Sequence, residues 1–299
     1  MAYEIPEMYR IKDFEAEVKG NILSLEWTGT AGFRIRYQNT TLLIDAFATR
    51  TGMLIAPFIK LKINRALCEE VFPEADHILV GHSHYDHLQD IPTVAKKTGA
   101  IVHGSNSTAR ILRGNGVEEE KIHVVETWKT YDCGSFKITF VPSLHGKALL
   151  GRVPCPGEIE KEFQEPLRMS WYRHSQVFGI IIDAGGFKIY HSGSADLMDE
   201  EIAKVGHVDL LMMCLAGRKG TPDYVERVAG KLQPEYILPH HYDNFFKPLM
   251  RPMKLLPSIN MPQFFEEVRA FNQEIPVIMP EIFQKIFFDT VNGQILNNK

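Results

Sequence analysis

Loops that carry histidine follow several of the strands predicted along this chain, and this recurrence limits the fold more than any other feature of the sequence. The loops contain residues 82–87, His145, residues 191–196 and residues 240–241. In α/β proteins, ligands bind beyond the carboxyl ends of the strands, where loops that are distant in the chain meet. The sequence therefore predicts an α/β fold in which these loops converge on one site.

Hydrophobic periodicity also indicates an alternation of strands and helices. Apolar and polar residues alternate in FRIRY, residues 33–37, as in a half-buried strand, whereas LLMMCLAG, residues 210–217, is typical of a central strand. Residues 90–99 predict a helix that opens with Asp90 and ends at Gly99. Such an alternation is the pattern of an α/β domain.

The segment HSHYDH, residues 82–87, holds three histidines and one aspartate. A core segment gains nothing from so many imidazoles, because each would need its own hydrogen-bond partner. A helix is not expected either, because the run has no apolar face. Neutral imidazole and carboxylate suit zinc and also bind manganese or iron, so the segment predicts a metal site. The following histidines read as surface or structural residues: His77, His103, His123, His174 and His207.

Composition argues against several classes of protein. The formal net charge is -4, with 33 basic against 37 acidic residues, so a general nucleic-acid binder is not expected. No apolar segment approaches the roughly 18 residues of a membrane span, and the charged residues 1–20 do not read as a secretory signal. The four cysteines are scattered without a CxxC pair, which indicates a reduced, cytoplasmic protein.

Several segments together resemble the metallo-β-lactamase superfamily. HSHYDH matches its HxHxDH signature, and TGTAGFRIRY, TLLIDAF and LPHHYD agree with it in order between about residues 25 and 243. The resemblance is closest to the branch that contains the L-ascorbate-6-phosphate lactonases and the phospholipase D that acts on N-acyl phosphatidylethanolamine. It implies a four-layer αβ/βα sandwich, with residues 1–299 as one domain and residues 146–176 as an insertion near the substrate.

The resemblance also implies a set of metal ligands. His240 and His241 are neighbours in an extended segment, so their side chains point to opposite faces, and the resemblance selects His241. Asp86 is expected to act in catalysis as well, as the acceptor of the proton of the attacking water. The implied ligands are His82, His84 and His145 for a first metal, and Asp86, His87 and His241 for a second.

One position departs from the superfamily pattern. Ser194 stands where an aspartate normally bridges the two metals, and an uncharged hydroxyl is a poor bridge. Asp196, two residues later, is a candidate to replace that aspartate as a ligand, or it is an ordinary helix-capping residue. His191 is expected beside the site or in the core, and it is a second candidate ligand in place of the missing aspartate. Asp45 is expected to orient a ligand histidine. The resemblance therefore implies one or two zinc ions, with Mn²⁺ or Fe as alternatives.

The expected activity is hydrolysis of an ester, lactone or phosphodiester bond by a metal-bound hydroxide. Ser194 leaves a second interpretation open, namely a degenerate member of the fold that binds metal or ligand without turnover. A di-iron redox protein and a nucleic-acid hydrolase of the same superfamily are less favoured. The substrate is expected to be a small or lipid-like molecule, with no nucleic-acid partner and no membrane span, and oligomerisation is left open. Within the insertion, the expected substrate contacts are Arg152, Arg168, Trp171 and Arg173.

Overall fold

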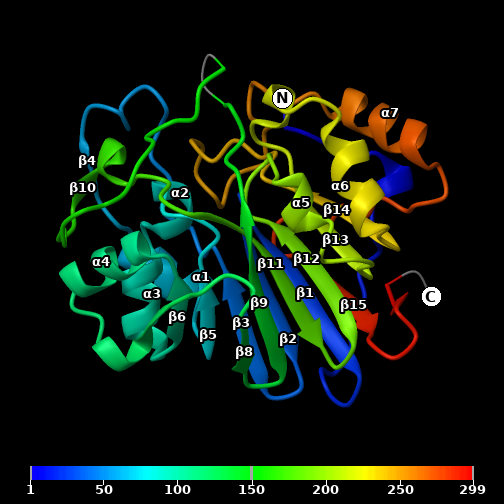
Figure 1. Ribbon diagram of the computed structural model, residues 1–299, viewed down its shortest axis with the longest axis horizontal. Coiled ribbons are helices and arrows are strands. Elements are labelled where there is room, and N and C mark those ends of the chain that lie inside the picture. The colour runs from blue at the N-terminus through cyan, green and yellow to red at the C-terminus, as the bar shows by residue number, and fades with distance from the viewer. Residues whose placement is uncertain (1, 149–150, 298–299) are drawn as a thin grey trace.

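The structure is a computed structural model that describes residues 2–148 and 151–297. Two β-sheets pack face to face, with helices on the outer sides (Figure 1). The eight-stranded sheet has the order β16-β15-β1-β2-β3-β5-β6-β7, and the six-stranded sheet has the order β14-β13-β12-β11-β9-β8. This arrangement confirms the αβ/βα sandwich that the sequence predicted.

Most strands are short. The eight-stranded sheet consists of β1 (Ile22–Gly29), β2 (Gly32–Tyr37), β3 (Thr40–Ile44), β5 (His77–Leu79), β6 (Ile101–Gly104), β7 (Ile122–Val124), β15 (Lys285–Asp289) and β16 (Gln294–Ile295). The six-stranded sheet consists of β8 (Thr130–Cys133), β9 (Phe136–Ser143), β11 (Val177–Ala184), β12 (Phe187–Ser192), β13 (Leu210–Cys214) and β14 (Tyr236–His240).

The helices are also short, and within the described residues none is both long and apolar enough to cross a membrane. The α-helices are α1 (Arg65–Val71), α2 (Tyr85–Leu88), α3 (Ile91–Thr98), α4 (Asn106–Gly114), α5 (Asp199–Ile202), α6 (Tyr224–Leu232) and α7 (Met261–Phe271). Single 3₁₀ turns occur at η1 (Glu7–Tyr9), η2 (Glu119–Lys121), η3 (Met169–Trp171) and η4 (Arg218–Gly220).

Apolar side chains fill the space between the two sheets. Trp27 and Phe33 of the eight-stranded sheet and Phe140 of the six-stranded sheet are fully buried in this core. Burial of each such side chain stabilises the fold by roughly 1.5–3 kcal/mol. A second apolar cluster, which includes Val94 and Leu112, lies under α1, α3 and α4. α6 and α7 pack against each other on the opposite side of the molecule (Figure 1).

Each histidine loop follows the carboxyl end of a strand, and within each sheet the strands that precede these loops run in one direction. β3, β5, β6 and β7 are parallel neighbours in one sheet, and β12, β13 and β14 are parallel neighbours in the other. β9 and β12 are both antiparallel to β11, which lies between them, so they also run in one direction. The loops after β5, β9, β12 and β14 are the loops that the sequence analysis singled out.

Two predicted elements are confirmed in detail. The strand predicted at residues 210–217 is β13, which ends earlier, at Cys214, and is buried along its whole length between β12 and β14. The helix predicted over residues 90–99 is α3, and Gly99 follows it in the left-handed conformation with φ 73°. Glycine is favoured there because it has no Cβ to clash with the backbone in that conformation.

The expectation that the segment 82–87 contains no helix was wrong. Tyr85–Leu88 form one helical turn, α2, directly after the extended His84. The turn has an apolar side after all, because Tyr85 and Leu88 are buried in the cluster under the helices. Asp86 and His87 are thereby left to face the candidate site.

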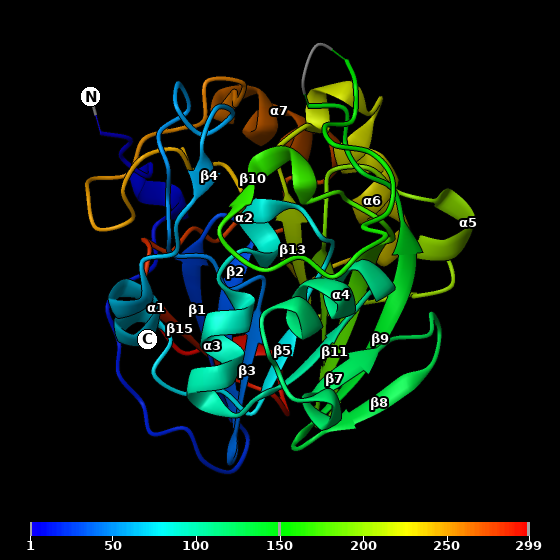
Figure 2. The same ribbon diagram turned by 90° about the vertical axis from the view of Figure 1, so that its left-hand side faces the viewer.

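Residues 151–176 of the insertion lie at the end of the molecule that carries the histidine loops. Its strand β10 (Leu167–Arg168) pairs with β4 (Lys60–Leu61) in a separate two-stranded sheet. Figure 2 shows β4, β10 and α2 at this same end. Tyr172 of the insertion is buried in the apolar cluster under the helices, so the insertion is part of the packed structure.

Candidate metal centre

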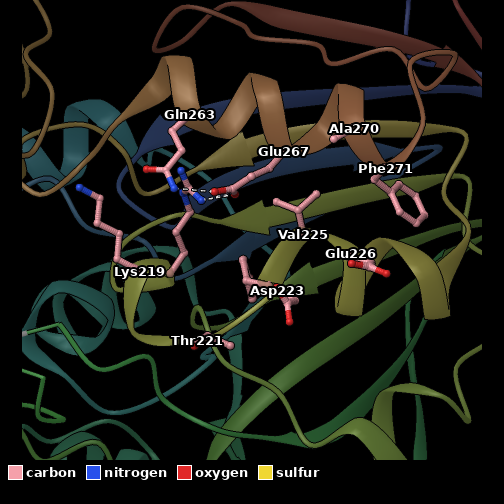
Figure 3. A pocket seen from close by; sticks show the side chains of 11 residues that line it. Lys219, Thr221, Asp223, Val225, Glu226, Gln263, Glu267, Ala270 and Phe271 are labelled. Atoms are coloured by element: carbon pink, nitrogen blue, oxygen red, sulfur yellow. Dashed lines mark hydrogen bonds and ion pairs between the residues drawn. The ribbon is translucent and has the colours of Figure 1, made fainter.

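A large surface pocket lies away from the histidine loops. It has a volume of about 940 Å³ and opens between α6 and α7 (Figure 3). Glu267 at its wall pairs with Arg218 and accepts a hydrogen bond of 2.9 Å from Nε2 of Gln263. This pocket contains none of the predicted metal ligands, which line a smaller cavity at the histidine loops instead.

Two groups of potential metal ligands adjoin each other in that smaller cavity. Within each group, one ligand atom of every residue lies within 4.8 Å of the ligand atoms of the other two. The ring centroids of His82 and His87, one from each group, are only 3.8 Å apart. The first group is His82, His84 and His145, and the second group is Asp86, His87 and His241.

Backbone carbonyls fix the protonated nitrogen of each imidazole in the first group. Because a carbonyl oxygen only accepts hydrogen bonds, the ring nitrogen that faces it must carry the proton. The opposite ring nitrogen then holds a free lone pair. The three contacts run from Nδ1 of His82 to Gly193 O (3.1 Å), from Nε2 of His84 to Pro154 O (3.0 Å), and from Nδ1 of His145 to Gly146 O (2.7 Å).

Two of the free lone pairs face each other. Nε2 of His82 lies 3.0 Å from Nδ1 of His84, although neither nitrogen carries a proton in the tautomers just described. Two lone pairs repel at this distance, whereas a cation between them would be attracted to both. Nitrogen ligands of tetrahedral zinc lie about 2.0–2.1 Å from the metal and hence about 3.3 Å from each other. The geometry of His82 and His84 therefore fits a shared metal ion.

Burial keeps the imidazoles of the first group neutral. It lowers the pKa of His82 well below its ordinary value, and the neighbouring histidines lower it further. Burial also lowers the pKa of His84 to about 4 and that of His145 to about 3. Since only the neutral ring can bind a metal, all three side chains are in the ligating form at neutral pH.

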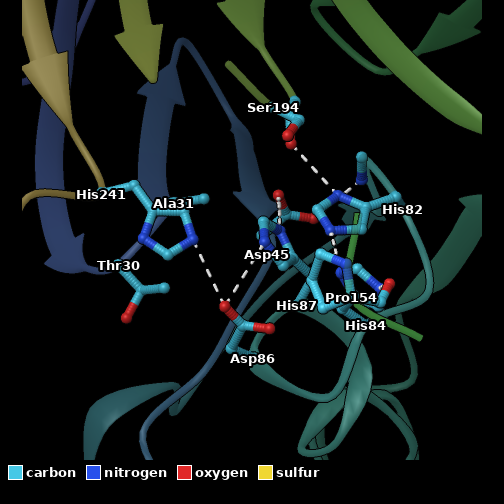
Figure 4. A network of polar contacts seen from close by, with 12 residues as sticks. Thr30, Ala31, Asp45, His82, His84, Asp86, His87, Pro154, Ser194 and His241 are labelled. Carbon is cyan, nitrogen blue, oxygen red and sulfur yellow. Dashed lines mark hydrogen bonds and ion pairs between the residues drawn. The ribbon is translucent and has the colours of Figure 1, made fainter. Parts of the chain in front are cut away.

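In the second group, Asp86 lies between two imidazoles (Figure 4). Oδ2 of Asp86 is 3.3 Å from Nε2 of His241 and 3.8 Å from Nε2 of His87. Burial alone would raise the pKa of Asp86, but His87 and the hydrogen bond from His241 lower it below its ordinary value. Asp86 therefore offers an anionic oxygen inside the cavity.

Asp45 lies behind the second group and orients His87. Oδ2 of Asp45 accepts a hydrogen bond of 2.7 Å from Nδ1 of His87, and Oδ1 accepts one of 2.8 Å from Gly81 N. Burial opposes protonation of His87, but Asp45 and Asp86 together raise its pKa. The contact holds a proton on Nδ1 and directs Nε2 toward Asp86, as expected of a residue that orients a metal ligand.

A left-handed turn brings His241 to the site. β14 ends at His240, and His241 follows it with φ 57°. His241 N donates to Thr30 O at 2.8 Å, and Thr30 N donates in turn to Oδ1 of Asp243 at 2.9 Å. Oδ2 of Asp243 forms a buried ion pair of 2.7 Å with Arg50. These contacts hold the turn, so that His241 and not His240 joins the second group.

The structure does not bring Asp196 to either group. Its Oδ1 accepts a hydrogen bond of 2.9 Å from Leu197 N, and its side chain lines a separate surface pocket. Ser194 does line the metal-site cavity, but its hydroxyl oxygen accepts a hydrogen bond of 3.1 Å from Gly146 N. Asp86 is therefore the one carboxylate of the two groups, and the replacement of the missing aspartate by Asp196 is not seen.

His191 lies behind the site and belongs to neither group. It is fully buried, its Nε2 donates to Ala31 O at 3.1 Å, and its ring stacks on that of His240 with centroids 4.6 Å apart. Burial lowers the pKa of His191 to about 4. Its environment is therefore that of a neutral core histidine.

The cavity over the two groups has a volume of about 370 Å³ and mostly apolar walls. A concave, largely apolar cavity with a few converging polar groups is the usual form of a small-molecule site. The sequence analysis expected the insertion at the substrate but did not single out Phe245 and Phe246, because an isolated Phe reads as a core residue. The apolar wall includes Met53, Met169, Tyr172, Phe245, Phe246 and Leu256.

The insertion contributes to this wall through other residues than those expected. Met169 and Tyr172 line the cavity, whereas the expected contacts do not. Arg168 instead donates to Phe58 O at 3.2 Å, and the ring of Trp171 packs on Phe163 with centroids 5.0 Å apart. The expected contacts that do not line the cavity are Arg152, Arg168, Trp171 and Arg173.

His174 of the insertion also lies beside the first group, which its sequence context did not indicate. Its ring centroid is 5.8 Å from that of His84 and 5.9 Å from that of His145, on which it stacks. Its Nδ1 donates to Ser175 O at 2.6 Å, so its other nitrogen is free. No strand end or motif precedes His174, so the sequence offered no signal for this placement.

Similarity to known proteins indicates the class to which this chain belongs. The model of the beta-lactamase superfamily domain matches residues 40–242. A UPF0173 metal-dependent hydrolase of Methylocella silvestris is 31% identical over 227 residues, which are 75% of this chain and 86% of that protein. Another, from Carboxydothermus hydrogenoformans, is 24% identical over 86% of this chain and 97% of its own length. The chain belongs to the UPF0173 family of metal-dependent hydrolases within the metallo-β-lactamase superfamily, and its class is that of a metal-dependent hydrolase.

Solved structures show the same fold at low sequence identity. Igni18, a novel metallo hydrolase from the archaeon Ignicoccus hospitalis, is similar with a TM-score of 0.59 and 17% identity over 89% of this chain and 98% of that one. CmlA, a diiron β-hydroxylase from Streptomyces venezuelae, also reaches 0.59, with 16% identity over 92% of this chain and 55% of that one. The same fold thus occurs in proteins named for different reactions, a hydrolase and a hydroxylase.

Proposed function

We propose that this chain uses a metal ion bound by the two groups to hydrolyse an ester, lactone or phosphodiester bond. The main observation behind this proposal is that two ring nitrogens, one of His82 and one of His84, direct their lone pairs at each other. A cation between the two nitrogens makes this contact favourable. The anionic carboxylate of Asp86 lies in the adjoining group, where its negative charge would stabilise a second cation.

Zinc is the metal that we propose, with manganese or iron as alternatives. Imidazole nitrogen with one carboxylate oxygen is a common donor set for zinc, and the other two metals accept it as well. Ser194 brings no charge to the position where a bridging carboxylate would stand. The second ion should therefore bind more weakly than the first, so that one or two ions are present per chain.

The residues of the chain have separate tasks in this reaction. A bound metal would lower the pKa of a coordinated water towards about 7 and polarise the oxygen of the scissile bond. Asp86 is held in its anionic form, so a carboxylate oxygen can accept the proton of the attacking water. Asp45 keeps a proton on Nδ1 of His87 and its other nitrogen toward the site. The apolar walls hold the apolar part of the substrate and exclude bulk water.

The substrate that suits this cavity is a small or lipid-like molecule. The aromatic and methionine side chains around the two groups offer contacts to an acyl chain or ring, and offer little to a polyanionic nucleic acid. A closer relation to the branch of the ascorbate-phosphate lactonases and the phospholipase D is part of the proposal, supported by HYDHL at residues 84–88 and LPHHYD at residues 238–243. Four free cysteines support a reducing, cytoplasmic location.

The proposal is tested by assaying the protein, before and after removal of metal with EDTA, on chromogenic esters, lactones and phosphodiesters. We expect turnover of at least one class, loss of turnover after chelation, and recovery when Zn²⁺ or Mn²⁺ is added. Turnover that is insensitive to the chelator would contradict the proposal. His84→Asn serves as a matched variant, because it removes one ligand and leaves the apolar walls in place.

The non-catalytic alternative is not favoured, because the curated relatives are named hydrolases. It would regain support if the metal-loaded protein turned over no substrate while Ser194→Asp did. The di-iron redox alternative predicts that purified protein contains iron and reacts with oxygen, and metal analysis distinguishes it directly.

A further inference from the structure

A third group of potential metal ligands lies at an edge of the sandwich, away from the candidate metal centre. Ligand atoms of His77, His103 and Cys133 all lie within 4.8 Å of one another. His77 precedes His82 by five residues of strand and loop, and an extended chain of that length spans roughly 16 Å. The group is therefore separate from the site described above.

Strand register explains how the three residues meet. His77 on β5 pairs with Ile101 on β6, two residues before His103, so both histidines point to one face of the eight-stranded sheet. Leu79 shares that face and is buried in the core between the sheets, so the face is the inner one. Cys133 comes from β8, the edge strand of the opposite sheet, and is also buried in that core.

Two of the three distances within the group match the edges of a metal tetrahedron. Nε2 of His103 lies 3.1 Å from Nδ1 of His77 and 3.6 Å from Sγ of Cys133. With zinc–nitrogen bonds of about 2.0–2.1 Å and zinc–sulfur bonds of about 2.3 Å, tetrahedral ligands lie about 3.3 Å (N to N) and about 3.5 Å (N to S) apart. Both observed distances are within a few tenths of an ångström of these values.

Hydrogen bonding alone satisfies this group poorly. An imidazole nitrogen carries either one proton or one lone pair, so Nε2 of His103 can make only one of its two contacts as a full hydrogen bond. The other nitrogen of His103, Nδ1, is buried without a hydrogen-bond partner within the described part of the chain, so no contact of Nδ1 prevents Nε2 from carrying the lone pair. A metal ion would use the lone pairs of all three residues at once.

We propose that His77, His103 and Cys133 bind a zinc ion that links the two sheets at their edge. His77 is only partly buried, which gives an ion a route from solvent, whereas His103 and Cys133 are nearly inaccessible. His123 stands opposite His103 in the register of β7, with ring centroids 5.0 Å apart, so its imidazole or a water can take the fourth position. Two imidazoles and a thiolate form a donor set that favours zinc over the hard cations.

The protonation states of the group are compatible with metal binding. Burial and the neighbouring histidines lower the pKa of His103 to about 3, so its ring is neutral. Burial and Asp132 raise the pKa of Cys133 to about 12, so the metal-free thiol keeps its proton. Zinc would displace that proton, as it does for other coordinating thiols. The expected role is structural, because the site joins buried strands of the two sheets.

The test is titration of metal-free protein with Co²⁺ as the probe. A cobalt–thiolate bond gives a charge-transfer absorption in the near ultraviolet, which ligation by histidine and aspartate alone does not give. We expect the wild-type protein to show this absorption. Cys133→Ser should abolish it and should bind about one equivalent less Co²⁺ than the wild type. His77→Asn changes a partly buried residue at the start of a strand and leaves the buried cysteine unaltered. This variant should weaken the absorption.

Two matched variants separate this site from the candidate metal centre. Cys155 lines the cavity of that centre, so Cys155→Ser should keep the absorption if the thiolate belongs to Cys133. His84→Asn should also keep it, and this holds whether or not the protein is a hydrolase. Absence of the absorption in the wild type, its survival in Cys133→Ser, or its loss in Cys155→Ser would each overturn the proposal.

Discussion

Replacing Asp45 with asparagine tests whether the protein sets the tautomer of a metal ligand. Asp45 uses both carboxylate oxygens as acceptors, one for His87 Nδ1 and one for Gly81 N. Asparagine has only one accepting oxygen, so one of the two contacts must be lost. If its NH₂ group faces Nδ1, the proton of His87 moves to Nε2 and blocks the lone pair that faces Asp86.

The size of the effect can be worked out in two ways. A buried hydrogen bond to a charged group contributes about 1.5–3 kcal/mol. Loss of a residue that orients a metal ligand weakens metal binding by about 10- to 100-fold, which is about 1.4–2.8 kcal/mol. The two figures agree, so we expect Asp45→Asn to bind zinc about 10- to 100-fold more weakly at the second group.

The assay is competition for Zn²⁺ between the protein and a chromophoric chelator, together with kcat/KM on any substrate found. Asp90→Asn is the matched control, because Asp90 is equally buried and accepts hydrogen bonds of 2.7 Å from Ala48 N and Thr49 N. Both bonds end on Oδ2, so the amide oxygen of asparagine can accept them as well. Asp90 belongs to neither ligand group, so Asp90→Asn should leave zinc affinity unchanged. The reasoning is refuted if Asp45→Asn binds zinc like the wild type, or if both variants weaken binding equally.

Three further outcomes are expected. Ser194→Asp should raise the metal content of protein purified without added metal towards two ions per chain, because it restores an anionic oxygen to the cavity; an unchanged content by mass spectrometry would argue against that role for the charge. Phe245→Ala should raise KM several-fold for substrates with long acyl groups but hardly for short ones, and an equal effect on both would mean that Phe245 does not contact substrate. The folded pKa values of His84 and His145, about 4 and about 3, lie below the roughly 6.5 of an unfolded imidazole, so the unfolded chain binds more protons between these values. The stability of EDTA-treated protein should therefore fall as the pH drops from about 7 towards 4, and a melting temperature that stays constant between pH 7 and pH 5 would contradict this.

The parts of the fold that the sequence predicted well are those in which local chemistry and periodicity agree. β13 is apolar along its whole length because both of its faces are covered, and that pattern can be read without knowing its partners. α2 was missed because one helical turn has no period to detect. Only its packing shows that Tyr85 and Leu88 form the apolar side of that turn.

For the candidate site, the sequence predicted the metal-ligating residues better than the apolar residues that line the cavity. Imidazoles and carboxylates are conspicuous because isolated buried ones are unfavourable, so the residues of HSHYDH already suggested a common purpose. Phe245 is as apolar as any core residue, and its place in the cavity depends on the chain path after His241. His103 and Cys133 are 30 residues apart and meet only through the pairing of strands in two different sheets. No short motif could indicate that contact.

The hydrogen bond from Nε2 of His84 to Pro154 O has a consequence for how this enzyme can change. Pro154 lies in the insertion, which also supplies Met169 and Tyr172 to the wall of the cavity. The segment that shapes the space for substrate therefore also sets the direction of a metal ligand. A relative with a different insertion could acquire a new specificity only if its backbone again presented a carbonyl to this histidine, which links the divergence of substrate preference to the retention of metal.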